Sequence, residues 1–280
     1  MREVDVKVIT DLVSEMCMEA NYQLSSDMKR VLSDAQSNEK SELGKNILVQ
    51  LQENLMIAQQ DSIPICQDTG MAVFFLKIGQ EVHFNGGSLT EAINDGVRRG
   101  YRDGFLRKSV VSDPLIRENT GDNTPAVVYY DIVSGDQIQI TCAPKGFGSE
   151  NMSRIFMLKP ADGADGVKNA VIQAVKDAGP NACPPMVVGV GIGGTFEKCA
   201  MMAKQALTRP CGEHSVIPYI SEMEKEILDK INRTGIGPAG LGGTTTALAV
   251  NIDTYATHIA GLPVAVNICC HVNRHITKNV

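Results

Sequence analysis

Three of the eight cysteines stand where a side chain is available for chemistry. Cys66 lies in the string PICQDTG, Cys183 in GPNACPP, and Cys270 directly before a histidine at the end of an apolar run. A thiolate in such a turn can bind a metal or act as a nucleophile. A lone cysteine is more often a small buried hydrophobic residue. The separations along the chain, 117 and 87 residues, match no short zinc or ferredoxin pattern, so any metal site that these three share must be assembled by the fold.

The other five cysteines are expected to pack inside the protein. They lie in helical patterns, in a strand, after a proline, or beside Cys270 on the opposite side of the same strand: Cys17, Cys199, Cys142, Cys211 and Cys269. Because adjacent residues of a strand face opposite ways, a redox pair of Cys269 and Cys270 is the weaker interpretation.

Several polar residues could accompany the three cysteines. Asp68 follows Cys66 by two residues, and an Asx turn before Gly70 is the structural alternative to a functional role. Arg107 lies in a region rich in surface cations. The string KGFGS (145–149) is typical of a backbone nest whose N–H groups receive an anion, although a plain turn is also possible. His258 precedes Cys270 by twelve residues, and a structural histidine is the commoner case.

The elements that must position these residues change in type along the chain. Apolar residues recur with a helical period up to about residue 60, and from residue 64 onward β-rich runs cover 71–79, 126–133, 137–143 and 154–159. A capping box at Ser88 starts a helix, and further helices are expected over 163–178, 195–208 and 216–233. The fold class is therefore α+β (an irregular α/β arrangement). A helical N-terminal layer over 1–62 precedes a mixed α/β region over 63–280, and together they form one domain.

Composition excludes several classes of function. The chain has 280 residues, 43% of them hydrophobic, and a net charge of −6, which argues against nucleic acid or an anionic membrane as the main partner. No apolar run approaches the length of about 20 residues that a membrane span needs, and the charged N-terminus is unlike a signal peptide. We expect a cytoplasmic protein whose cysteines are thiols.

A glycine-rich run imitates a dinucleotide-binding fingerprint. GVGIGG (189–194) satisfies G-x-G-x-x-G, follows an apolar run and precedes a helix. The acidic residue expected about 20 positions later is missing, with Glu213 a poor substitute. Nucleotide binding is therefore a remote alternative, which saturable NAD(P) binding would reveal.

The order of longer strings resembles one family from end to end. CQDTG (66–70), NTGDNTPA (119–126), NACPP (181–185), GPAGLGGTTTAL (237–248), THIAGLPVAVN (257–267) and CCHVNRH (269–275) are similar to the α subunit of class I, iron–sulfur fumarate hydratases and tartrate dehydratases. The resemblance implies a [4Fe–4S] cluster held by Cys66, Cys183 and Cys270. One iron would lack a protein ligand and would act as a Lewis acid on the leaving hydroxyl group.

The same resemblance implies roles for the neighbouring residues. Asp68 and His258 would be catalytic: Asp68 would assist proton transfer or orient the residue that carries it out, and His258 would also contact substrate. The substrate-binding set would comprise Gln67, Arg107, Gly146, Gly148 and His258, with Arg107 clamping a carboxylate bidentately.

The resemblance also implies partners and a reaction. Single-chain members of the family continue beyond the point ten residues after Cys270 where this sequence stops, and that further part supplies Arg, Lys and Thr groups. We therefore expect a separate β subunit, dimerisation through α and an α2β2 assembly. The expected reaction is reversible hydration of fumarate to L-malate. L-Tartrate dehydratase or mesaconate hydratase is the alternative, and a non-catalytic iron–sulfur sensor is a remote one.

Overall fold

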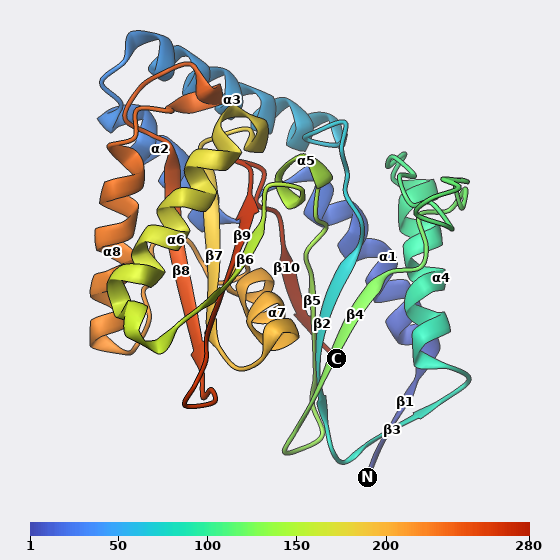
Figure 1. Ribbon diagram of the computed structural model, residues 1–280. Helices are drawn as coiled ribbons and strands as arrows, with labels where there is room; N and C mark the ends of the chain where they lie inside the picture. The colour runs from blue at the N-terminus through green and yellow to red at the C-terminus, as the bar shows by residue number, and fades with distance from the viewer. The chain divides into compact units, whose positions relative to one another are not determined.

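The computed structural model describes all 280 residues, and the chain divides into two compact units (Figure 1). The first unit comprises residues 1–25, 54–147 and 274–280, and the second comprises 26–53 and 148–273. Helix α2 (Ser26–Asn38) and most of helix α3 (Glu42–Asp61) thus belong to the second unit. The expected division between a layer 1–62 and a region 63–280 differs from these units, because the chain passes between them several times.

The first unit is a four-stranded mixed sheet with the order β10–β5–β2–β4. Its strands are β2 (Val73–Gly79), β4 (Val127–Val133), β5 (Ile138–Cys142) and β10 (Ile276–Asn279). β2 runs parallel to β4 and antiparallel to β5, and β10 is antiparallel to β5. A separate parallel pair joins β1 (Arg2–Asp5) to β3 (Val82–Asn85).

Helices α1 (Val6–Tyr22) and α4 (Leu89–Asp103) bury their apolar faces with this sheet. α4 begins at the N-cap Ser88, whose hydroxyl oxygen accepts a hydrogen bond from the Glu91 N–H, as the capping box predicts. The two helices approach closely because α4 has glycine at Gly96 and Gly100. A Cβ at either position would stand within 2.7 Å of a carbonyl oxygen of α1.

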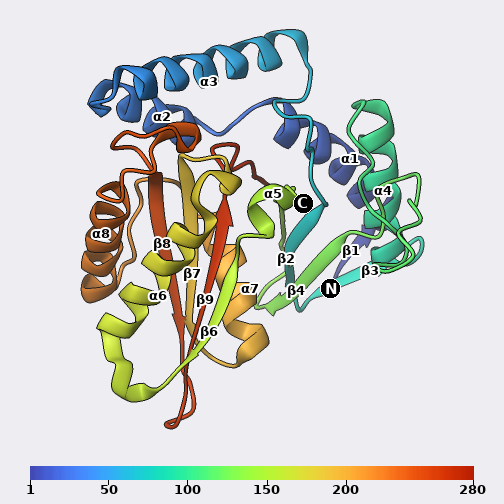
Figure 2. The same ribbon diagram turned by 45° about the horizontal axis from the view of Figure 1, so that its top comes forward.

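The second unit is built on a sheet with the order β6–β9–β7–β8 (Figure 2). Its strands are β6 (Arg154–Leu158), β7 (Met186–Gly193), β8 (Ala247–Tyr255) and β9 (Leu262–Cys269). β7 is parallel to β8 and antiparallel to β9. Helices α6 (Gly163–Ala178) and α8 (Pro218–Asn232) cover one face, while α7 (Phe196–Ala206) packs on the other. The short helix α5 (Phe147–Glu150) precedes β6.

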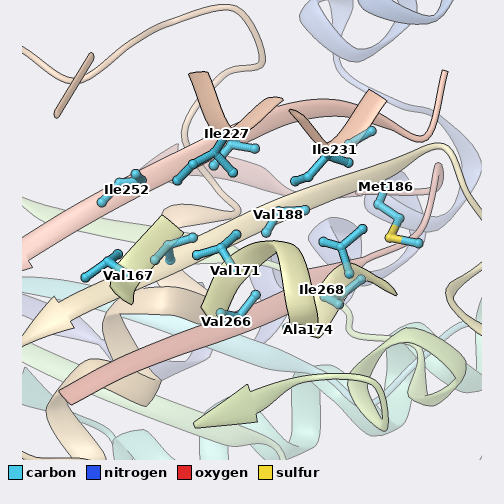
Figure 3. Packing of buried hydrophobic residues seen from close by; sticks show 14 of the residues in the cluster. Val167, Val171, Ala174, Met186, Val188, Ile227, Ile231, Ile252, Val266 and Ile268 are labelled. Atoms are coloured by element: carbon cyan, nitrogen blue, oxygen red, sulfur yellow. The ribbon is translucent and has the colours of Figure 1, made fainter. Parts of the chain in front are cut away.

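The largest core cluster lies between this sheet and the helices α6 and α8 (Figure 3). Alternate residues of β7 and β9 point into it, and helical residues at spacings of three and four meet them: Val188, Val190, Val264, Val266, Ile268, Val167, Val171, Ile227 and Ile231. The intervening residues of β7 and β9 face α7 instead. No helix of the chain is both long and apolar enough to cross a membrane.

The observed elements confirm the α+β class, and most of the expected helices and strands are present. The strands β1, β3, β7, β8 and β10 and the single-turn helix α5 were not among the expected elements. Helix α5 begins within 145–149, where the sequence left a backbone nest or a plain turn open.

Candidate functional site

Accessibility separates the eight cysteines into two groups, with no disulfide among them. The five that were expected to pack are buried, whereas Cys183 is exposed and Cys66 and Cys270 are half-buried. Burial raises the pKa of Cys211 to about 12, and it also raises the pKa of the Cys142 and Cys199 thiols. The three cysteines predicted to bind iron are thus the three that solvent reaches.

Cys66 lies in a loop of the first unit that is fixed through its main chain. The buried Tyr101 hydroxyl donates hydrogen bonds to the carbonyl oxygens of Thr69 and Gly70, both at 3.0 Å. The Asn123 side-chain amide donates to the same Gly70 oxygen at 3.2 Å. Within the loop, the Asp68 N–H donates to Cys66 Sγ at 3.4 Å. An N–H directed at the sulfur stabilises a thiolate and suits a ligand of an iron–sulfur cluster.

Both carboxylate oxygens of Asp68 accept main-chain hydrogen bonds. Oδ1 accepts from the Gly70 N–H at 2.9 Å, which is the Asx turn considered from the sequence. Oδ2 accepts from the Phe147 N–H at 2.9 Å, where α5 begins. The sequence KGFGS suggests main-chain N–H groups that receive an anion. The group that the Phe147 N–H receives is the Asp68 carboxylate, a side chain of the same unit. A Cβ on Gly146 would stand 3.0 Å from Oδ2, so a side chain there would crowd the carboxylate.

Arg107 is tied to the same loop through its backbone. The Thr69 hydroxyl accepts from the Arg107 N–H at 2.9 Å and donates to the Arg107 carbonyl oxygen at 3.2 Å. The side chains of Arg107 and Gln67 are exposed, and the Arg107 guanidinium forms no ion pair within the chain. The first unit therefore groups Cys66, Gln67, Asp68, Arg107 and Gly146 around one loop.

Cys183 and Cys270 lie at the same end of β7 and β9, the two central strands of the second unit's sheet. Cys183 follows a 3-10 turn and has a left-handed backbone, with φ 51° and ψ 62°. Its carbonyl oxygen accepts from the N–H of His271 at 3.4 Å and is 3.1 Å from Nδ1 of the same residue. Because a carbonyl can only accept, Nδ1 carries the proton. The pairing of Val187 with Cys269 places the start of β7 beside the end of β9.

A glycine-rich loop supports the Cys183 turn. The Ala239 N–H donates to the Pro184 carbonyl oxygen at 2.9 Å, and a Cβ on Gly240 would stand 2.3 Å from Pro180. The far end of this loop is held by Glu39, which is 2% exposed. Its carboxylate accepts from the N–H groups of Thr244 and Thr245 at 2.7–3.0 Å. Burial opposes ionisation, but these bonds and one from the Ser41 N–H lower the pKa of Glu39 to about 2.

The run GVGIGG serves packing. Residues 189–193 lie within β7, and a Cβ on Gly189 or Gly191 would stand 2.0 or 2.1 Å from a carbonyl oxygen of α7. These glycines therefore let the helix lie close against the strand. The geometry leaves no space for a pyrophosphate between them, which agrees with the low weight given to nucleotide binding.

His258 lies at the other end of β9 from Cys270. It is exposed in the turn between β8 and β9, where Nδ1 accepts a hydrogen bond from the Ala260 N–H at 3.2 Å. The eight residues of β9 separate the two ends by about 23 Å at 3.3 Å per residue. Figure 1 shows this turn at the opposite end of the sheet from the start of β7. Within one chain, His258 is therefore distant from Cys183 and Cys270. Gly148, another predicted substrate-binding residue, is exposed in α5.

Within each unit, no group of three His, Cys, Asp or Glu side chains is gathered closely enough to hold a metal ion. Cys66 belongs to the first unit, and Cys183 and Cys270 belong to the second. The chemistry of the donors, three accessible thiols without a carboxylate or imidazole among them, fits an iron–sulfur cluster. A cavity of about 520 Å³ beside α7 and β8 contains none of these residues.

Sequence reasoning missed the buried polar residues that hold the loops. Tyr101, Glu39 and Asn123 carry no local sequence signal for this role. Arg274 lies within the quoted string CCHVNRH, but nothing in the sequence indicates that it is 4% exposed and donates to the Asp68 carbonyl oxygen.

Comparison with known proteins gives the family. The model of the fumarate hydratase (Fumerase) family matches residues 10–279. A relative from Methanocaldococcus jannaschii, named putative L(+)-tartrate dehydratase subunit alpha, is 43% identical over 278 residues and covers 97% of each chain. The L(+)-tartrate dehydratase subunit alpha of Escherichia coli K12 is 30% identical over 275 residues, with coverage of 97% of this chain and 90% of the relative. The chain belongs to the fumarate hydratase family, and it is a hydro-lyase α subunit.

Proposed function

We propose that this chain is the α subunit of a [4Fe–4S] hydro-lyase that hydrates fumarate to L-malate reversibly. The observation that supports the proposal is that solvent reaches three of the eight cysteines and the other five are buried. The three thiols singled out by sequence are the accessible ones. Cys66 Sγ accepts from the Asp68 N–H, and His271, next to Cys270, is hydrogen-bonded to the Cys183 carbonyl oxygen. Five buried thiols, some with raised pKa values, are unsuited to metal binding.

Cys66, Cys183 and Cys270 would hold the cluster. When bound, the cluster supplies a Lewis-acidic iron that stabilises the charge on a departing hydroxyl group. Arg107 binds a substrate carboxylate through its unpaired guanidinium. Gln67 and the glycines Gly146 and Gly148 line the substrate site. Asp68 orients or moves the proton next to the second carboxylate, from a position that the Gly70 and Phe147 N–H groups fix.

The relatives favour a second candidate substrate. Both are named as subunits of L(+)-tartrate dehydratase, so dehydration of L-tartrate is the alternative, and hydration of mesaconate is a further one. These substrates differ by a hydroxyl or a methyl group, and such differences are decided by contacts to one pocket group. Turnover of the assembled enzyme on fumarate, L-tartrate and mesaconate in parallel distinguishes them.

The active site also needs a β subunit, as the name "subunit alpha" of the relatives suggests. We further infer that two α chains associate in an α2β2 assembly and that His258 reaches substrate in the site of a second copy. The length of β9, about 23 Å, supports this inference, since His258 and Cys270 lie at its two ends. Mixing inactive His258→Ala and Cys270→Ser chains with β subunit tests it. Partial recovery of turnover is expected, and no recovery would contradict sharing between copies.

The first experiment is anaerobic reconstitution with iron and sulfide. Bound iron and thiolate-to-iron absorption are compared among wild type, Cys66→Ser, Cys183→Ser and Cys270→Ser, with buried Cys199→Ser as the control. Cluster uptake should be lost in each of the first three and kept in the control. Normal uptake in all variants, or none in wild type, would refute the assignment. We also expect the protein to work in a reducing compartment such as the cytoplasm, since all eight cysteines are without a disulfide.

Asp68→Asn separates catalysis from cluster binding but requires a structural control. An amide NH2 would face one of the two N–H groups that now donate to the carboxylate. Iron content must therefore be measured beside turnover. Loss of turnover with four irons retained supports a role for Asp68 in the reaction, whereas joint loss shows only that the loop has moved.

A further inference from the structure

Arg274 is a buried cation of the first unit with one unfilled donor. It is 4% exposed and forms no ion pair. Nη2 donates to the Asp68 carbonyl oxygen, and Nε donates to the Pro144 carbonyl oxygen at 3.4 Å. Nη1 is buried and has no acceptor. Arginine keeps its charge in proteins. The acceptors of the Arg274 guanidinium are two neutral carbonyl oxygens.

This arrangement is unfavourable for a residue that serves packing alone. A buried ionised group costs free energy unless it is paired, and an unfilled buried donor adds to that cost. The charge of a buried arginine is usually balanced by a nearby carboxylate. Arg209, whose Nε is also buried and unfilled, still donates to the Glu224 carboxylate at 2.6 Å and lies 4.0 Å from Asp253. Arg274 lacks any such partner, which indicates that an anion outside the chain completes it.

The surroundings of Arg274 indicate where that anion acts. Its two filled donors hold the loop of Cys66 and Asp68 and the segment before Gly146. A Cβ on Gly146 would stand 3.0 Å from Asp68 Oδ2 and 3.8 Å from Arg274 Nη2. The Asp68 carboxylate forms no ion pair with Arg274, and its two oxygens accept from the Gly70 and Phe147 N–H groups. The guanidinium is thus built into the loop that carries the predicted ligand.

We propose that the charge of Arg274, held beside the Cys66–Gly70 loop, attracts the anion bound there. That anion is either the thiolate-ligated cluster or a carboxylate of the substrate. The inference rests on the proposed function, because an anion at this loop is expected only if Cys66 binds the cluster. Charge acts over several ångströms in a buried site, so direct contact with Nη1 is not required.

The test compares Arg274→Gln, which removes the charge, with Arg274→Lys, which keeps the charge and removes the fork. Arg209→Gln is the control, since that arginine already has carboxylate partners. Each protein is reconstituted anaerobically as the full chain. Iron and sulfide content, the reduction potential of the cluster from EPR-monitored titration, and the Kd for L-malate with β subunit present are then measured.

We expect Arg274→Gln to change one of two properties while Arg274→Lys stays near wild type. A lower potential with unchanged Kd identifies the cluster as the anion, because loss of a nearby cation favours the oxidised, less negative state. A Kd for L-malate raised at least tenfold with unchanged potential identifies the substrate. An Arg274→Gln protein that is loaded with cluster and matches wild type in both measurements overturns the proposal.

Two further outcomes keep the test decisive. If Arg274→Gln does not fold, the test rests on Arg274→Lys, which keeps the charge. A cluster potential equal to that of wild type and a Kd for L-malate within threefold of wild type support the role of the charge. A shifted potential or a tenfold weaker Kd in this variant refutes the proposal. If wild type itself takes up no iron and sulfide, the proposed function fails. That result is distinct from failure of the Arg274 proposal, which requires a loaded wild type and an unaffected variant.

Discussion

Replacing Glu39 with glutamine should destabilise the second unit by about 3 kcal/mol at neutral pH. The carboxylate is 2% exposed and is stabilised by neutral donors, among them the N–H groups of Lys40, Ser41, Thr244 and Thr245. These bonds lower its pKa from 4.5 to about 2. At about 1.4 kcal/mol per pKa unit, this difference corresponds to about 3 kcal/mol of folding free energy. Glutamine would present an NH2 group to N–H donors, so little of that contribution would survive.

The sign of the pH dependence follows from the lowered pKa. The stabilisation by Glu39 is fully present above pH 4.5, the unfolded value, and is lost as the pH falls toward 2. The stability difference between wild type and Glu39→Gln should therefore shrink from about 3 kcal/mol at pH 7 to about 1.5 kcal/mol at pH 3.

Urea unfolding at pH 7, 5, 4 and 3 measures this difference, provided that the m-value is unchanged. Glu42→Gln is the matched control, because its side chain is 83% exposed and one turn away on α3. The reasoning is refuted if Glu39→Gln costs less than about 1 kcal/mol at pH 7, or if the difference stays constant from pH 7 to pH 3.

Three further predictions test the packing and the thiols. Tyr101→Phe removes the donor to two loop carbonyls and should cost about 1–2 kcal/mol in urea unfolding; a neutral effect would show that water replaces the hydroxyl. Gly191→Ala places a Cβ 2.1 Å from the Cys199 carbonyl oxygen and should cost about 3 kcal/mol or yield insoluble protein, whereas Gly121→Ala, with open space, tests strain from positive φ alone. In native protein at pH 8, mass spectrometry should find iodoacetamide on Cys183 first and on Cys66 and Cys270 next, well before buried Cys142 and Cys211, whose pKa values burial raises; equal rates would contradict this order.

The strong local signals in the sequence predicted most of the helices and about half of the strands. The expected ranges of α6 and α8 agree with the observed bounds within a few residues, and α4 begins at the expected cap. β10 (Ile276–Asn279) was missed because four residues with half-buried alternation form a strand only where β5 offers an edge. The run GVGIGG shows the same limit, since only the approach of α7 reveals that its glycines belong inside a strand.

The candidate site shows why spacing in sequence is a poor guide to distance. Twelve residues separate His258 from Cys270 and would span less than 20 Å in a helix, but eight of the intervening residues form the extended strand β9. Cys183 and Cys270 are 87 residues apart, and the antiparallel pairing of β7 with β9 brings their turns together. Such pairing depends on the sheet order, which one sequence does not reveal.

In both units, buried polar side chains hold the cysteine-bearing loops by hydrogen bonds to their main chain or to that of a supporting loop. In the first, Tyr101, Asn123 and Arg274 direct buried donors at the carbonyls of the Cys66 loop. In the second, Glu39 directs a buried acceptor at the loop that supports the Cys183 turn. Glycine-rich loops bury little apolar surface, so hydrogen bonds to their main chain decide their position. Substitution of these buried polar residues should therefore lower cluster loading, although none of them is a predicted ligand. Variants at these positions require an iron assay beside any measurement of turnover.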